Sequence, residues 1–274
     1  MKIRTSHFIV HAILLLGAIY SAFPFIWMVW TSLRSSGEAF NTGTVSLLEH
    51  WDALSNYRQA LFDTPLIKFM ANGVVVCSGI LLFQVLTAVP SAYALAKLNF
   101  RGKRLFVGTL LVCFAIPFQS LALPLFVALS QMKALNSYFS LIFPFVGSVF
   151  AILMLAQFLR SYPDEILEAA RLDGMSEFAI LLRLIFPASW PAIATFSLFS
   201  VSSHWNDLYW PLIVITSPDL APPTLGILFF RSDESGDKMG PLMAAATMVM
   251  LPLFVFFLVA QRRFVQGITN TGVK

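Results

Sequence analysis

The sequence is short of charged residues, since only 12% of its 274 residues are Asp, Glu, Lys or Arg. Soluble domains carry roughly a quarter, so a soluble globular domain is a poor description of this chain. Its two cysteines, Cys77 and Cys113, both lie within apolar runs, which argues against a disulfide framework. The four scattered histidines lack the spacing of a zinc site. A soluble domain, a disulfide framework and a zinc site are therefore all poor explanations of this sequence.

What the chain has instead is long runs without any charged residue, and a mean hydropathy of +0.77. Each run exceeds the roughly 18 residues that mark a candidate membrane-spanning helix. Alternating segments of about 10 residues, which would indicate an outer-membrane barrel, are absent. The predicted fold class is therefore all-α integral membrane, with six transmembrane helices in a single domain over residues 1–274. The predicted spans are about 8–33, 69–96, 105–132, 134–159, 187–211 and 239–261.

Lys and Arg are divided unequally between the two sides of the predicted membrane, with twelve on one side and six on the other. Their excess in short loops marks the cytoplasmic side, and the cluster Lys97–Arg104 is the strongest single signal. Both termini are therefore expected in the cytoplasm. The formal charge of +4 is explained by this topology, so we predict no nucleic-acid partner.

Two predicted connections on the opposite side are long. Residues 34–68 are expected to contain a short surface helix. Residues 217–238 hold Pro218, Pro222 and Pro223 followed by a polar stretch, which predicts a loop. Loops of this length are often functional, although a passive connector has the same composition.

The one long cytoplasmic loop, residues 161–186, has mixed charge and a helical pattern. Pro163 suits the first turn of a helix, and Gly174 suits the left-handed position just past a helix end. A second short helix can begin at Ser176 and run towards Pro187. We therefore predict a cytoplasmic hairpin of two short helices. Ala169 and Ala170 would leave a flat patch that another backbone could approach.

This loop resembles the "EAA" signature of ABC importer permeases. The chain reads Glu168-Ala169-Ala170, three residues, Gly174, nine residues, and Leu184-Ile185-Phe186-Pro187. The family pattern ends in Ile-x-Leu-Pro, so Leu184 and Phe186 are conservative departures. A generic amphipathic hairpin is the alternative, but the full spacing in the correct loop favours the family.

Other stretches are similar to the carbohydrate-uptake branch of that family, and together they cover essentially the whole chain. The similarity is to the shorter, second permease of maltose-type importers. The matching stretches are Arg171-Leu172-Asp173-Gly174, Ile116-Pro117-Phe118-Gln119 with Pro124, Leu135-Asn136-Ser137-Tyr138, and Trp205-Asn206-Asp207 with Trp210-Pro211.

The resemblance implies a permease of an importer for a sugar, oligosaccharide or polyol, in the inner membrane of a bacterium or archaeon. Such permeases are not enzymes, so no cofactor is expected on this chain, and ATP and Mg are expected on partner ATPase subunits. The only Gly-Lys pair, Gly102-Lys103, is followed by Arg104 and does not make a phosphate-binding loop. The implied partners are a second permease, two ATPase subunits, an extracytoplasmic solute-binding protein and the lipid bilayer.

The resemblance also implies that the hairpin couples ATPase closure to the spans. The candidate coupling residues are Glu168, Ala169, Ala170, Asp173 and Gly174. Glu168 would make a charge contact with the ATPase, while the alanines and the glycine would permit close packing. The alternative for Glu168 is a solvated helix charge, because exposed charges usually contribute little.

Asp207 is the one carboxylate inside a predicted span, and such groups mark transport pathways by default. Together with Trp205, Asn206 and Tyr209 it resembles a sugar-binding set of acceptors, donors and flat faces. An interfacial aromatic belt with a helix-end carboxylate explains the same residues. Gln119 is a second pathway candidate, with an inter-helix hydrogen bond as its alternative.

In the family, the connection before the last span reaches towards the docked binding protein, which implies contacts from Arg231, Ser232, Asp233 and Glu234. No Lys or Arg lies deep in a span, which favours a neutral solute unless the second permease supplies charge. Rival interpretations are an ion-coupled secondary transporter, a membrane-embedded enzyme, and an ABC permease for a solute that is not a carbohydrate. Asp207 alone is a poor coupling site for the first of these.

Overall fold

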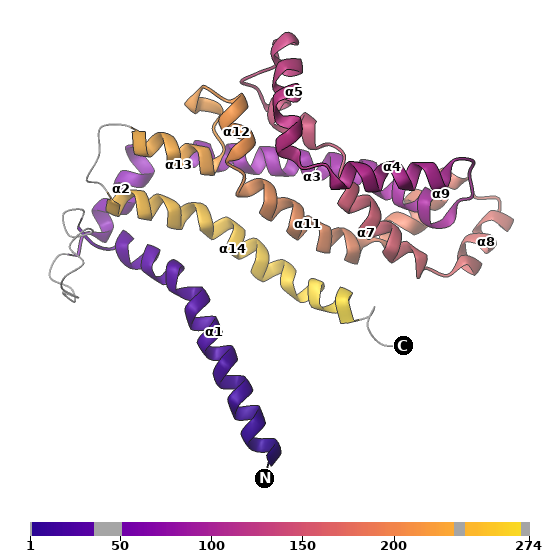
Figure 1. Cartoon of the computed structure of the whole chain (residues 1–274), viewed down its shortest axis with the longest axis horizontal. Helices are drawn as coiled ribbons and strands as arrows, with labels where there is room; N and C mark the ends of the chain where they lie inside the picture. The colour runs from indigo at the N-terminus through magenta and orange to yellow at the C-terminus, as the bar shows by residue number, and fades with distance from the viewer. Residues whose placement is uncertain (1, 36–50, 233–238, 270–274) are drawn as a thin grey trace. The chain divides into compact units, whose positions relative to one another are not determined.

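The computed structural model describes residues 2–35, 51–232 and 239–269, and over these ranges the chain is built from helices (Figure 1). The only strand-like pairing within them is an isolated antiparallel bridge between Arg34 and Trp51. The chain divides into two compact units. One comprises Met1–Ile67 with Gly226–Leu251, and the other comprises Lys68–Leu225 with Pro252–Lys274.

The first unit contains α1 (Lys2–Ser32), α2 (Ala53–Phe62) and parts of α13 (Pro223–Ser232) and α14 (Met239–Thr269). The short helix predicted within residues 34–68 is α2. Its buried Asn56 donates from Nδ2 to the backbone carbonyls at the end of α1, at 2.9 Å from Ser32 and 2.7 Å from Arg34. These bonds satisfy carbonyls that a helix end leaves without an intrahelical partner.

The second unit holds most of the helices and both candidate sites. Its core is formed by buried side chains between Ala88 and Phe196. The α-helices in chain order are α3 (Leu66–Lys97), α4 (Lys103–Ala115), α5 (Phe118–Gln131), α6 (Tyr138–Ile142), α7 (Val149–Arg160), α8 (Asp164–Leu172), α9 (Glu177–Ile180), α10 (Phe186–Ala188), α11 (Trp190–Trp205) and α12 (Tyr209–Val214), followed by the start of α13 and by α14 from Pro252 onward.

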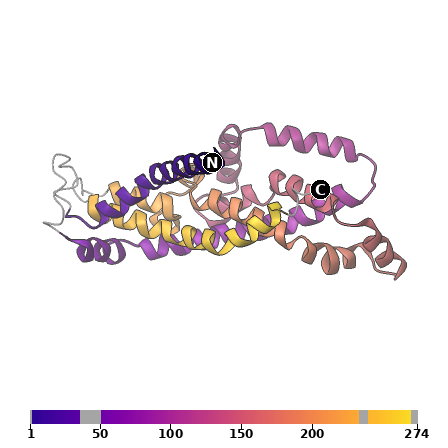
Figure 2. The same cartoon turned by 90° about the horizontal axis from the view of Figure 1, so that it is seen from below.

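Within the described ranges, three helical stretches are long and apolar enough to cross a membrane, namely His7–Ser32 of α1, all of α3, and Met239–Val259 of α14. Three further helix pairs pass the same test jointly but are bent. The bends are 93° between α4 and α5, 43° between residues 138–145 and 149–160, and 69° between residues 177–188 and 190–205. Figures 1 and 2 show α5 turned away from α4. Six spans therefore require each bent pair to cross as one span.

The bend between α4 and α5 follows from Pro117. A residue before proline is biased away from the helical region, and Ile116 is extended with φ −79° and ψ 119°. Pro124, in contrast, lies inside α5. The helix predicted over 105–132 is thus two helices, with the break on the N-terminal side of Gln119.

The loop predicted over residues 217–238 is in part helical. Its described part forms a 3₁₀ turn at Pro218–Leu220 and then α13, which begins at Pro223. Proline is favoured in the first turn of a helix because that position has no intrahelical N–H bond to lose. The prediction of a loop was therefore wrong for residues 223–232, since Pro223 starts a helix.

Candidate functional site

The predicted hairpin, residues 161–186, lies at one end of the second unit in both views (Figures 1 and 2). Pro163 immediately precedes α8, with Asp164 and Glu165 in the first turn, where carboxylates favour the positive helix end. Ser176 caps α9 by accepting a bond from the Ala179 N–H. The second arm continues through a π-helical turn at Leu181–Ile185 into α10.

Gly174 makes the turn between the two arms. Its φ is +80°, a left-handed conformation that L-residues with side chains rarely adopt. Its N–H donates to the Arg171 carbonyl, and the Met175 N–H donates to the Ala170 carbonyl, each at 3.0 Å. This pair of bonds is the Schellman arrangement that closes a helix C-terminus. The prediction of a left-handed glycine here is confirmed.

The hairpin has an inner face that packs into the protein and an outer face that does not. Leu167, Ala170 and Ile180 are buried in the same core as α3 and α7. Glu168, Ala169 and Asp173 are exposed. Of the predicted pair Ala169 and Ala170, only Ala169 can form a flat patch for a partner. Ala170 is instead covered by the core of its own chain.

The outer face also carries large apolar side chains that the motif did not single out. Leu172 has 88% of its surface exposed at the end of α8, and Phe178 and Leu182 on the second arm are also exposed. Because Leu172 lies two positions from Ala170, helical periodicity turns it away from the buried side. That spacing could have identified it from the sequence.

Two polar anchors connect the hairpin to the C-terminal part of α3. Lys97 donates from Nζ to the Tyr162 carbonyl at 2.6 Å and to Asp164 Oδ1 at 2.7 Å. Tyr93 donates from its hydroxyl to Glu177 Oε2 at 2.5 Å, while Arg171 Nε pairs with Glu177 Oε1 at 2.7 Å. The hairpin is therefore held to α3 at the start of α8 and again at the start of α9.

The hydrogen bonds from Arg171, and then that from Tyr93, lower the pKa of Glu177 below its ordinary value of 4.5. Because the folded-state pKa is depressed, the stabilisation is fully present above the ordinary value and is lost as the pH falls through the folded-state value. This anchor is therefore fully charged at neutral pH.

The predicted pathway cluster lies where α11 ends and α12 begins. α11 ends at Trp205 with Asn206 as its cap, and Asp207 and Leu208 are not helical. The Asp207 carboxylate is half-buried and accepts a bond of 3.4 Å from the Trp210 N–H at the start of α12. Asp207 is thus a carboxylate at a helix start, a position that itself favours negative charge.

The cavity beside Asp207 is small. Its volume is about 10 Å³, and its lining includes His204, Trp210 and Pro211. A void of that size has room for at most about one water molecule. In the conformation of this structure it cannot hold a sugar ring.

The members of the predicted cluster differ in accessibility. Trp205 is buried, and a Cβ added to Gly73 of α3 would lie 3.1 Å from its ring. Trp205 is therefore a packing residue here and is not available to a solute. Asn206 and Tyr209 are exposed, as is Gln119 on α5. α5 and α12 meet through Phe118 and Trp210, whose ring centroids are 5.4 Å apart.

Two polar residues of α3, Asn72 and Gln84, are buried but were not among the sequence candidates. Gln84 Oε1 accepts a 2.6 Å bond from the Ser200 hydroxyl of α11. Asn72 contacts the segment that precedes α13. Polar residues inside a predicted span are themselves a signal, so Asn72 and Gln84 could have been identified from the sequence in the same way as Gln119.

The predicted binding-protein contacts fall largely beyond what the structure describes. Arg231 and Ser232 end α13, but their side chains lie outside the described residues, as do Asp233 and Glu234 altogether.

Comparison with known proteins places these features in a family. The chain is 28% identical, over 94% of its length and 92% of the relative's, to the arabinooligosaccharides transport system permease protein AraQ of Halalkalibacterium halodurans. It superposes with a TM-score of 0.83 on a chain of a bacterial ABC transporter involved in importing the acidic polysaccharide alginate, at 25% identity and covering 96% of this chain and 98% of that one.

A second structure, of bacterial alginate ABC transporter in complex with alginate pentasaccharide-bound periplasmic protein, shares the fold with a TM-score of 0.63 at 17% identity, covering 94% of each chain. The family model described as "Binding-protein-dependent transport system inner membrane component" matches residues 84–270, a range that includes both the hairpin and the α11–α12 break. This chain belongs to the family of binding-protein-dependent transport system inner membrane components.

Proposed function

We propose that this chain is a permease subunit of an ATP-driven ABC importer for a sugar, oligosaccharide or related polyol. It forms half of a translocation pore and couples ATPase closure to alternating access. The observation that carries the proposal is the hairpin, which is anchored to α3 on one face and presents Glu168, Ala169 and Leu172 on the other. Family membership supports this role.

The remaining machinery belongs to other chains. Two ATPase subunits bind ATP and Mg, a second permease completes the pore, and an extracytoplasmic solute-binding protein delivers the solute. The assembly lies in the inner membrane of a bacterium or archaeon, with the hairpin and both termini in the cytoplasm. The family description, which names dependence on a binding protein, supports the last partner. The alginate transporter solved with a periplasmic protein supports it too.

The exposed face of the hairpin suits docking to an ATPase subunit. Leu172 on α8, exposed to 88%, and the exposed Phe178 and Leu182 on the second arm offer apolar surface outside the long apolar helices. Such surface commonly marks an interaction site. Ala169 and the turn at Gly174 permit close approach. Glu168 and Asp173 supply charge at the edge of this surface.

Changing Leu172 to Asp tests the docking surface. Burying a charge against an apolar partner is unfavourable, so we expect L172D to reduce retention of the ATPase subunits about tenfold or more during purification in detergent. Leu54 on α2 is exposed to 84% and provides a matched control. L54D adds the same charge to a helix outside the predicted spans and should retain the ATPase subunits like the wild type.

Retention is measured by quantitative immunoblotting of the co-purified subunits. If the wild-type chain retains no ATPase subunit, the proposed function is wrong. If L172D and L54D behave alike, the hairpin is not the docking surface.

For the solute pathway we propose the exposed residues near the break between α11 and α12, namely Asn206 and Tyr209, with Asp207 beside them and Gln119 on the adjacent α5. Trp205 supports them by packing. The cavity of about 10 Å³ beside Asp207 is too small for a sugar ring, so the proposed pathway runs along the exposed side of these residues.

Cysteine accessibility tests this pathway. In a Cys113→Ser background, N206C is expected to react with water-soluble thiol reagents at rates that differ severalfold between nucleotide-free and ATP-trapped complexes. L129C, at a buried position of α5, should stay unreactive in both. An N206C rate that is the same in every nucleotide state would contradict the pathway.

For the binding-protein contact, the proposal remains Arg231, Ser232, Asp233 and Glu234, at the end of α13 and just after it. Relatives act on both an arabinooligosaccharide and an acidic polysaccharide. No Lys or Arg lies deep in a predicted span of this chain, so an anionic solute would need positive charge from the second permease. Direct binding measurements on the cognate solute-binding protein identify the solute.

A further inference from the structure

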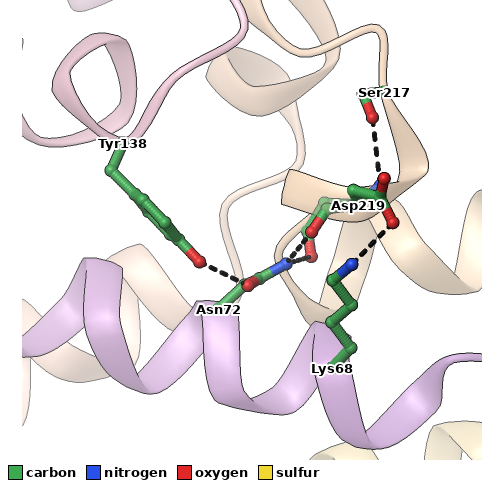
Figure 3. Close-up of polar contacts among 6 residues, drawn as sticks. Lys68, Asn72, Tyr138, Ser217 and Asp219 are labelled. Atoms are coloured by element: carbon green, nitrogen blue, oxygen red, sulfur yellow. Dashed lines mark hydrogen bonds and ion pairs between the residues drawn. The ribbon is translucent and has the colours of Figure 1, made fainter.

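α3 is bonded at both ends to segments that are distant in sequence. Near its C-terminus, Tyr93 and Lys97 hold the hairpin. Near its N-terminus, Lys68 and Asn72 hold residues 217–222, the segment between α12 and α13 (Figure 3). We call this the 217–222 segment.

Asn72 is the central contact at the N-terminal end of α3. Its Nδ2 donates to the carbonyls of Asp219 and Ala221, each at 3.0 Å, and its Oδ1 accepts from the Tyr138 hydroxyl at 2.6 Å (Figure 3). Asn72 is buried, so each bond replaces one that water would otherwise provide. The amide therefore joins α3, α6 and the 217–222 segment in one bonded group.

Lys68 adds little to this group. Its ion pair with Asp219 is 2.6 Å long, but the two side chains are 52% and 77% exposed, and exposed ion pairs typically contribute little. Gly73 contributes more directly, because a Cβ there would lie 2.6 Å from Pro223. The close approach of α3 to the start of α13 depends on that missing side chain.

The hairpin end has the same construction. Tyr93 is buried, and its hydroxyl reaches the Glu177 carboxylate that also pairs with Arg171. The Lys97 side chain is only 5% exposed although its partner Asp164 lies in the open. A buried stem holds the ammonium in place, so this anchor is better positioned than the Lys68 pair.

Between its two bonded ends, α3 is one continuous helix packed along one face. Residues Val76, Ile80, Ala88 and Ala92 are buried, and Gln84 bonds to Ser200 of α11 midway. Asn72 and Tyr93 are separated by about 32 Å at a rise of 1.5 Å per residue. A closely packed helix moves as a body more readily than it deforms.

We propose that α3 is the strut that links the ATPase-docking hairpin to the 217–222 segment, with Asn72 and Tyr93 as the positioning residues at its two ends. The proposal rests on the proposed function, because that function places an ATPase subunit at the hairpin and the binding protein on the opposite side. When the ATPase moves the hairpin, α3 carries the 217–222 segment with it. Docking of the binding protein at the 217–222 segment shifts the position of the hairpin through α3 in the same way.

Two matched hydroxyl deletions test the strut. Y93F removes the bond to Glu177 at one end. Y138F removes the bond that fixes the orientation of the Asn72 amide, on which the bonds to the 217–222 segment depend, at the other. Each is expected to lower the ratio of binding-protein-stimulated to basal ATP hydrolysis about fivefold, the size of one hydrogen bond. Y20F deletes the hydroxyl of an exposed tyrosine on α1 and serves as the control.

The double variant Y93F/Y138F tests whether the two ends of α3 act through one strut. Sites this far apart normally act independently. Independent effects would lower the ratio of stimulated to basal ATP hydrolysis about 25-fold in the double variant. If both bonds serve one strut, breaking either end already disconnects it, and the double variant loses only about fivefold. Thermal stability in detergent is measured in parallel and should fall additively, because folding energies of distant sites add.

The outcomes separate the two proposals. A wild-type complex that retains ATPase subunits and is stimulated by binding protein supports the proposed function whatever the variants do. A multiplicative loss in the double variant, or no loss in either single variant, overturns the strut while leaving the function intact. A wild-type complex without ATPase subunits overturns the function first.

Discussion

The variant G174V is expected to enter the membrane normally and yet to lose transport by about tenfold or more. Gly174 has φ +80° at the turn of the hairpin, and a β-branched residue is strongly disfavoured there. The left-handed region costs an ordinary L-residue roughly 1–2 kcal/mol. Nothing lies within 4 Å of a Cβ built at Gly174, so the effect comes from the backbone and not from a clash.

Relieving that strain must open the two bonds that close α8, from the Gly174 and Met175 N–H groups. The exposed end of α8, with Leu172, then loses its fixed position relative to the second arm. Solute uptake into proteoliposomes and retention of ATPase subunits are the measurements. Both should fall together, because the same turn shapes the proposed docking surface.

Two glycines provide the controls for G174V. Gly108 in α4 also has open space around its Cβ position but an ordinary backbone, so G108V should transport normally. Gly102 has φ +85° before α4, so G102V imposes comparable strain away from the hairpin. Transport by G174V equal to that of G108V would contradict a role for the hairpin turn. A loss of ATPase subunits in G102V equal to that in G174V would show that backbone strain outside the hairpin also weakens retention of these subunits.

W210A is expected to lower the free energy of unfolding by about 3–5 kcal/mol, the usual cost of removing a large buried aromatic side chain. Trp210 is completely buried at the start of α12. Its ring meets Phe118 edge-on at 5.4 Å and Phe145 at 6.5 Å. Its Nε1 donates to the Ser140 carbonyl at 2.8 Å. One side chain therefore joins α12 to α5, α6 and the turn after α6.

W210F separates packing from hydrogen bonding. Phenylalanine keeps much of the ring but leaves the Ser140 carbonyl without its donor, which costs about 1–3 kcal/mol. Trp190 of α11 is 52% exposed, so W190A should cost well under half as much as W210A. Unfolding in mixed micelles, followed by circular dichroism, measures all three. A W210A stability within about 1 kcal/mol of wild type would mean that the α12 contacts contribute little to this fold.

Much of the architecture could be predicted because the signals are local. Charge-free runs longer than about 18 residues predict apolar helices regardless of their neighbours, and α1, α3 and α14 appear where expected. The hairpin could be predicted for the same reason. Pro163, Gly174 and Ser176 act on the backbone within a few residues of their own positions.

The breaks in the helices were only partly predictable. Pro117 explains why α4 ends at Ala115, yet Pro124 has the same chemistry and lies inside α5. Likewise Pro223 starts α13 in a segment expected to be a loop. A proline restricts its own φ and its predecessor, but whether the chain turns there depends on what packs around it.

The membrane class, the family signature and the hairpin turn follow from local sequence signals alone. Which faces of the spanning helices are covered depends on tertiary contacts: Trp205 is packed while Tyr209 stays exposed, and Asn72 bonds to a segment about 150 residues away. In a soluble helix the apolar face is the buried face, but in a membrane lipid is as apolar as the core. The hydrophobic pattern therefore cannot show which side of a helix meets its neighbours, and only the contacts with distant helices settle it.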